Sequence, residues 1–73
     1  MLTTFKLTDG STVTGNSKDI MVMWTQDPLS NEDWKTIGDA VNKGIVVINA
    51  AHIVAIRKPT DTEIDHYNVF GTR

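Results

Sequence analysis

Apolar and polar positions alternate through the first part of the chain, in the segment FKLTDGSTVTGN. Phe5 and Leu7 fall on one side of a strand, and Val13 is the matching apolar residue beyond the turn. The Asp9-Gly10 pair between them is a strong signal for a hairpin turn. The pattern therefore predicts two antiparallel strands at the start of the chain.

The next apolar run, DIMVMWT at residues 19–25, predicts a third strand with apolar residues on both of its sides. One side carries Ile20, Val22 and Trp24, and the other carries Met21 and Met23. Asp27-Pro28 ends this strand, because proline cannot donate a hydrogen bond to a neighbouring strand. We expect both sides to be covered.

The segment LSNEDWKTIGDAVNKG predicts a helix. Ser30 can cap it, with Asp33 at the third helical position, and Gly44 is placed to end it in a left-handed conformation. The apolar stripe that we expect to face the core consists of Trp34, Ile37 and Val41, with Ala40 alongside. Gly38 lies on the same stripe, where it either permits a close approach to a sheet or is simply tolerated.

The stretch GIVVINAAHIVAIRKP contains two apolar runs, residues 45–48 and 53–56, separated by residues 49–52. Neither run alternates with polar residues, which is typical of strands that are buried on both faces. We predict two adjacent strands joined by a tight bend, with Pro59 closing the second strand.

These elements predict an α+β fold. It is a small, strongly bent five-stranded antiparallel sheet or barrel in the order βββαββ, with one helix between strands three and four. We expect residues 1–59 to form a single domain, and residues 60–73 to form a C-terminal tail that packs on the domain or on a partner subunit. The tail shows both a helical recurrence of apolar side chains and a strand-like alternation of acidic ones, so both conformations stay open.

One helix can cover one face of such a sheet, so apolar surface is left over. With 73 residues and no cysteine, the chain has a small core and no disulfide to support it. A large exposed apolar patch is uncommon on a monomer, so we expect a symmetric homo-oligomer. The candidate interface residues are Met21, Met23, Val46, Ile48, Val54, Ile56, Tyr67 and Phe70.

The net charge of −2 argues against non-specific binding of nucleic acid, for which a basic surface is typical. No apolar run is long enough to span a membrane, and no secretory leader is recognisable. We therefore expect a cytoplasmic protein without a membrane partner.

Two segments resemble the Sm-like small β-barrel family. FKLTDGSTVTG is similar to its first motif, and IVVINAAHIVAI is similar to its second, in which a tight turn joins two strands that close the barrel. The resemblance implies a bent barrel, a ring-like assembly and RNA binding. In the family's RNA-binding turn, however, the places of an arginine-glycine pair and a following polar residue hold Asn49, Ala50 and His52. RNA is therefore not the favoured ligand.

The sequence carries no recognisable catalytic constellation. GSTVTGNSK has the glycine spacing of a phosphate-binding loop but lacks a lysine and a hydroxyl residue directly after the second glycine. No acid or nucleophile flanks His52 in the sequence. His66 follows Asp65 and lies near Glu63, but two histidines, one in a turn and one in the tail, give little support for a metal site. We therefore expect no enzymatic activity, no cofactor and no metal.

We expect a non-enzymatic binding module that acts as a homo-oligomer. Its ligand would be a small anion such as a nucleotide, or a host factor, as for an accessory protein of a phage or mobile element. The candidate ligand contacts are Trp24, Asn49, His52, Arg57 and Lys58. An Sm-like RNA-binding protein and a pure protein–protein interaction module are the alternatives.

Overall fold

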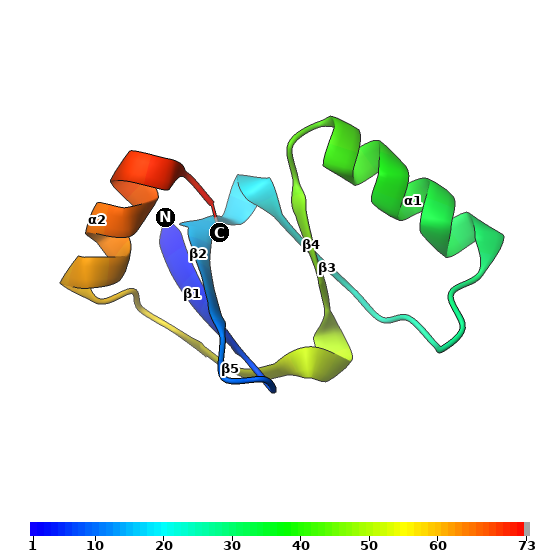
Figure 1. Cartoon of the computed structure of the whole chain (residues 1–73), viewed down its shortest axis with the longest axis horizontal. Coiled ribbons are helices and arrows are strands. Elements are labelled where there is room, and N and C mark those ends of the chain that lie inside the picture. Colours follow the sequence, from blue (N-terminus) through cyan, green and yellow to red (C-terminus); the bar gives the residue numbers. More distant parts are fainter. Residues whose placement is uncertain (73) are drawn as a thin grey trace.

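The computed structural model describes residues 1–72, which form two sheets and two long helices (Figure 1). The strands are β1 (Leu2–Leu7), β2 (Thr12–Asn16), β3 (Ile20–Met23), β4 (Val46–Asn49) and β5 (Ile53–Arg57). The helices are α1 (Asn31–Asn42) and α2 (Asp61–Phe70), with short 3₁₀ turns η1 (Ser17–Asp19) and η2 (Ala50–His52). Figure 1 shows the three-stranded sheet with α2 on the left and the β3–β4 pair with α1 on the right.

The expectation of one bent antiparallel sheet or closed barrel is wrong. Three strands form an antiparallel sheet in the order β2-β1-β5, whereas β3 and β4 form a separate parallel pair. Parallel strands need a long crossover, and the connection between β3 and β4 contains α1. The barrel that the Sm-like resemblance implied is not formed by residues 1–72.

The predicted bend between the last two strands does not make them neighbours. β4 pairs with β3, and β5 pairs with β1, so η2 carries the chain from one sheet to the other. The side chain of Asn49 caps this turn by accepting a hydrogen bond from the Ala51 amide at 3.0 Å. Along the chain, the strands and helices follow the order βββαββα, with a second helix after the predicted βββαββ.

The N-terminal hairpin is confirmed. β1 and β2 pair in antiparallel register, and Gly10 in the loop has a φ of 87°, which favours glycine. The Asp9 carboxylate accepts hydrogen bonds from the hydroxyl and amide of Ser11, and these bonds hold the pKa of Asp9 below its ordinary value.

The caps of α1 are also confirmed. Ser30 and Asp33 form a reciprocal capping box, with distances of 3.1 and 3.2 Å. Gly44 follows the helix with a φ of 77°. The predicted buried stripe is only partly correct, because Trp34 and Val41 are exposed. Ala40 is the buried residue of the helix, and α1 contacts β4.

Gly38 has open space around it, since a Cβ atom at this position would meet nothing within 4 Å. Gly38 therefore does not serve a close approach of the helix to a sheet, and the glycine is simply tolerated at this position. We expect Gly38→Ala to raise the free energy of unfolding by about 1 kcal/mol, because glycine lowers helix stability by that amount. Urea denaturation followed by circular dichroism measures the change. Gly44→Ala is the control and should destabilise, because its positive φ strains alanine. Destabilisation by Gly38→Ala would show that this helix face is packed.

The tail is helical from Asp61 to Phe70, which decides between the two conformations left open. Thr60 caps α2, and its hydroxyl and amide form a capping box with Glu63. Glu63 also binds Arg57 at the end of β5, so the start of α2 is held against the three-stranded sheet. Beyond α2, Thr72 lies against Gly15 so closely that a Cβ at Gly15 would collide with it.

The core is small. Among residues 1–72, the enclosed apolar side chains are Ala40 and Ile48, and the enclosed polar ones are Thr4 and Thr14, whose hydroxyls are 2.7 Å apart. Nine large apolar side chains of the described residues are exposed. They are Met1, Val22, Trp24, Trp34, Val41, Val54, Ile56, Val69 and Phe70. No helix within residues 1–72 has both the length and the apolar character needed to cross a membrane.

Candidate functional site

A pocket of about 550 Å³ lies at the carboxyl ends of β3 and β4. It is bounded by the ends of the two strands, by the segment between β3 and α1, and by η2. The lining residues are Met23, Thr25, Gln26, Asp27, Leu29, Ile37, Val47, Asn49, Ala51 and His52. Ligand sites in open parallel sheets occur at the carboxyl ends of the strands, so the strand–helix–strand unit places the pocket where such sites are expected.

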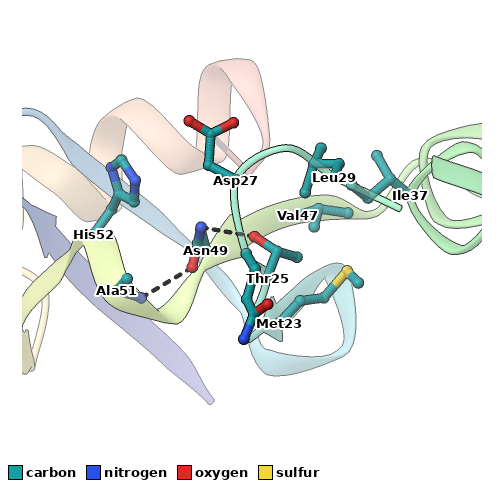
Figure 2. Close-up of a pocket in the computed structure, with 10 residues that line it drawn as sticks. Met23, Thr25, Asp27, Leu29, Ile37, Val47, Asn49, Ala51 and His52 are labelled. Atoms are coloured by element: carbon teal, nitrogen blue, oxygen red, sulfur yellow. Dashed lines mark hydrogen bonds between the residues drawn. The ribbon is translucent and has the colours of Figure 1, made fainter. Parts of the chain in front are cut away.

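The pocket has an apolar end and a polar end (Figure 2). Leu29, Ile37 and Val47 lie together at the end beside α1. Thr25, Asp27, Asn49 and His52 lie at the other end. A volume of several hundred Å³ with mostly apolar walls and a few polar groups is typical of small-molecule sites.

Asn49 is the central polar residue of the pocket. Its Nδ2 donates a hydrogen bond to Thr25 Oγ1 at 2.8 Å, and its Oδ1 accepts from the Ala51 amide at 3.0 Å (Figure 2). These bonds fix the orientation of the amide. The Asn49 amide has two N–H hydrogens and uses one of them in the bond to Thr25, so the second can donate to a ligand. The Thr25 hydroxyl acts as an acceptor in that bond, so its own hydrogen can also be donated.

The charged and titratable groups of the polar end are the Asp27 carboxylate and the His52 imidazole. None of the described lining residues is a lysine or an arginine. The backbone of His52 is held in place because its carbonyl accepts the Thr8 amide at 2.9 Å. The side chains of this end therefore suit a neutral or cationic group better than an anion.

The predicted ligand contacts are only partly brought together. Asn49 and His52 both line the pocket, as their place in the bend indicated. Trp24 precedes the lining residue Thr25 but is itself 80% exposed and outside the lining. Arg57 is the last residue of β5, Lys58 follows it, and both lie outside the lining. The Arg57 guanidinium is already engaged, with Nη1 and Nη2 bound to the two Glu63 carboxylate oxygens at 2.7 and 3.0 Å.

The predicted interface residues fall into three groups. Ile48 is enclosed within the chain itself. The half-buried residues are Met21, Met23, Val46 and Tyr67. The exposed residues are Val54, Ile56 and Phe70. Met23 lines the pocket on the α1 side of the β3–β4 pair, so this side is partly covered without a second subunit.

Several lining residues were not foreseen. Thr25 and Asp27 come from the end of the predicted third strand, and Leu29 comes from the segment that predicts the helix. Ile37 belongs to the apolar stripe expected to face the core, and Val47 to a strand expected to be buried on both faces. The signal that could have found them is the strand–helix–strand order, because it permits a parallel pairing of β3 and β4, and the segments after parallel strands meet at one edge of the sheet.

A second, smaller cavity of about 350 Å³ lies between α2 and β2. Its lining residues are Thr12, Thr14, Thr62, Glu63 and His66. The Arg57 guanidinium and the Thr60 cap hold the pKa of Glu63 at about 2, so this carboxylate stays charged and engaged. Residues 1–72 contain no group of three or more histidine, cysteine, aspartate or glutamate side chains placed to share a metal ion.

Comparison of the chain with family models, with curated proteins and with solved structures finds no match.

Proposed function

We propose that the chain is a non-enzymatic binding module for a small molecule that has an apolar ring and a neutral or cationic hydrogen-bonding group. The observation that carries this proposal is the pocket at the carboxyl ends of β3 and β4, with its apolar and polar ends. Burial of an apolar ring against Leu29, Ile37 and Val47 would supply most of the affinity.

The polar end supports an orienting role. The free donors of Asn49 and Thr25 can bond a carbonyl or ring nitrogen of the ligand, and Asp27 can bond a donor or a cation. Because Asn49 is held by two bonds of its own, it needs little reorganisation on binding. A nucleobase or an aromatic amine has the required combination of groups.

The anionic ligand expected from the sequence stays a prediction. A phosphate at the polar end would face Asp27 without a described lysine or arginine to neutralise it. Arg57 would have to leave Glu63 before it could take part. The same consideration applies to RNA, whose phosphate backbone needs basic side chains.

Two matched probe pairs test the charge preference. Tryptamine and indole-3-acetate share an indole ring but carry opposite charges, and adenosine and AMP differ by a phosphate. We expect tryptamine and adenosine to raise the melting temperature by about 5–10 °C at a tenfold excess over Kd, which corresponds to about 1.4 kcal/mol. The two anions should give little shift. A response to the anions alone, or to none of the four probes, would overturn the proposal.

Variants connect the response to the pocket. Asn49→Ala should weaken both active probes about tenfold, the worth of one hydrogen bond. Asn49→Ala also removes the cap of η2 and could therefore change the local structure. The second variant is Asp27→Asn, because Asp27 is exposed and its substitution should leave the fold intact. Asp27→Asn should weaken tryptamine about tenfold and leave adenosine unchanged. Asn68→Ala on α2 is the control and should change neither. Unchanged binding in both pocket variants would place the ligand elsewhere.

A further inference from the structure

The outer edge of β5 is an apolar strand edge without a neighbour. β5 is the last strand in the order β2-β1-β5, and no strand within residues 1–72 pairs with its other side. Four of its five residues are exposed, including Val54 at 61% and Ile56 at 63%. Strand edges that present apolar residues and open backbone groups readily pair with another strand.

The opposite edge of the same sheet is different. β2 carries the polar sequence TVTGN, and its Gly15 is covered by Thr72. Residues 53–56 of β5 contain no charge, and the charged pair Arg57 and Lys58 comes only at the end of the strand. β2 is therefore the polar edge of this sheet and β5 the apolar edge, so we expect pairing at β5.

The chain exposes more surface than a compact monomer of its mass does. The surface area is 5269 Å², whereas a monomeric protein of 8.1 kDa typically exposes about 4,500 Å². The radius of gyration of 12.7 Å likewise exceeds the value of about 11 Å for a compact chain of this length. The excess of about 770 Å² is close to the area of about 800 Å² that each partner buries in a stable interface.

We propose that β5 pairs in antiparallel register with β5 of a second copy of this chain, across a twofold axis at Ala55. Such an interface uses the same strand on both copies and therefore closes as a dimer. With Ala55 at the axis, Val54 of each copy lies opposite Ile56 of the other, so the four exposed apolar side chains form one cluster. The two three-stranded sheets then join into one continuous sheet of six strands.

This register is compatible with the charges at the ends of the strand. Arg57 falls opposite Ile53 of the other copy and can keep its ion pair with Glu63, because Glu63 comes from α2 and not from the outer edge. Pro59 follows soon after and cannot donate to a sheet, which limits the pairing to the length of β5. The proposal does not depend on any ligand in the pocket.

Sedimentation equilibrium or native mass spectrometry tests the pairing. We expect the unmodified chain to form a particle of twice the 8.1 kDa chain mass. Ile56→Lys should weaken the dimer about 30-fold or more, as for a central interface residue. Val41→Lys, on the exposed side of α1, is the matched control and should leave the dimer unchanged.

Amide hydrogen exchange of the unmodified chain adds a readout that does not depend on a variant. Protection of β5 should rise as the protein concentration passes through the dissociation constant, whereas protection of α1 should not. A monomer at 100 μM protein would overturn the proposal. So would a dimer that Val41→Lys disrupts and Ile56→Lys does not, since this result would place the interface on α1.

Discussion

Ile48→Ala is expected to lower the free energy of unfolding by about 2–4 kcal/mol, the usual cost of truncating an enclosed isoleucine. Ile48 is only 5% exposed and is the one large apolar side chain enclosed to this degree within residues 1–72. Its neighbour Val47 lines the pocket beside Ile37 of α1. Because side chains alternate along a strand, Ile48 points to the opposite face of β4, away from α1.

The size of this effect matters because the core is so small. A domain of this length has only a few kcal/mol of net stability, so the loss would remove much of it. Urea denaturation at a fixed protein concentration measures the change. Val69→Ala, at a residue that is 74% exposed on α2, is the control and should cost less than about 0.5 kcal/mol. A cost below about 1 kcal/mol for Ile48→Ala would show that β4 is not enclosed as described.

Glu63→Gln is expected to lower the free energy of unfolding by about 1–2 kcal/mol at pH 7. The Glu63 carboxylate accepts two hydrogen bonds from Arg57 and one from the Thr60 amide, and its side chain is 17% exposed. Glutamine keeps the shape but removes the charge, so it weakens both the ion pair and the helix cap. The effect is moderate because the Arg57 side chain is 40% exposed and therefore screened by water.

The pH dependence gives this prediction a second readout. The hydrogen bonds from Arg57 lower the pKa of Glu63 from 4.5 to about 2 in the folded chain, so the charged form is favoured on folding. Its contribution is fully present above about pH 4.5 and is lost as the pH falls through about 2. Glu63→Gln should therefore lose less stability than the unmodified chain across this window.

Asp65→Asn is the matched control for this pH dependence, because Asp65 is an exposed residue on the same helix. It should follow the acid transition of the unmodified chain. If Glu63→Gln and the unmodified chain lost stability in parallel between pH 4.5 and 2, the ion pair would contribute nothing to folding. Acid titration of the unfolding free energy by urea denaturation at each pH measures the difference.

The parts of the fold that could be predicted from the sequence are those with local causes. The Asp9-Gly10 turn, the Ser30 cap and the end of α1 at Gly44 each depend on residues within a few positions of one another. The apolar side chains of the tail also recur at a helical spacing, which is a local pattern that the sequence shows directly. Because acidic residues alternate in the same segment, the spacing alone left the conformation open, although Thr60 and Glu63 are spaced as in a capping box.

The pairing of strands could not be predicted because it has distant causes. An apolar run such as residues 45–48 fits a parallel and an antiparallel neighbour equally well, since both faces are apolar. The prediction assigned β4 and β5 to one sheet because they are close in sequence, whereas η2 separates them. The rotation of α1 likewise depends on tertiary packing, and Ala40 is buried whereas Trp34 is exposed.

The candidate site was found only in part for the same reason. Asn49 and His52 lie in a bend between two apolar runs, which makes them candidate ligand contacts, and both line the pocket. Asp27 and Leu29 lie far from this bend in sequence and meet it only through the parallel pairing of β3 and β4. Arg57 was a reasonable candidate by charge, but its partner Glu63 lies in a helix that the sequence left undecided.

An NMR titration of the ¹⁵N-labelled chain with adenosine, repeated with tryptamine, tests most directly whether the pocket at the carboxyl ends of β3 and β4 is the binding site. We predict saturable amide shifts that centre on the pocket backbone. The amides concerned are those of Thr25, Gln26, Asn49, Ala51 and His52. Shifts centred on β5 or α2, or no shift at millimolar concentrations of either probe, would contradict the assignment of this pocket as the binding site.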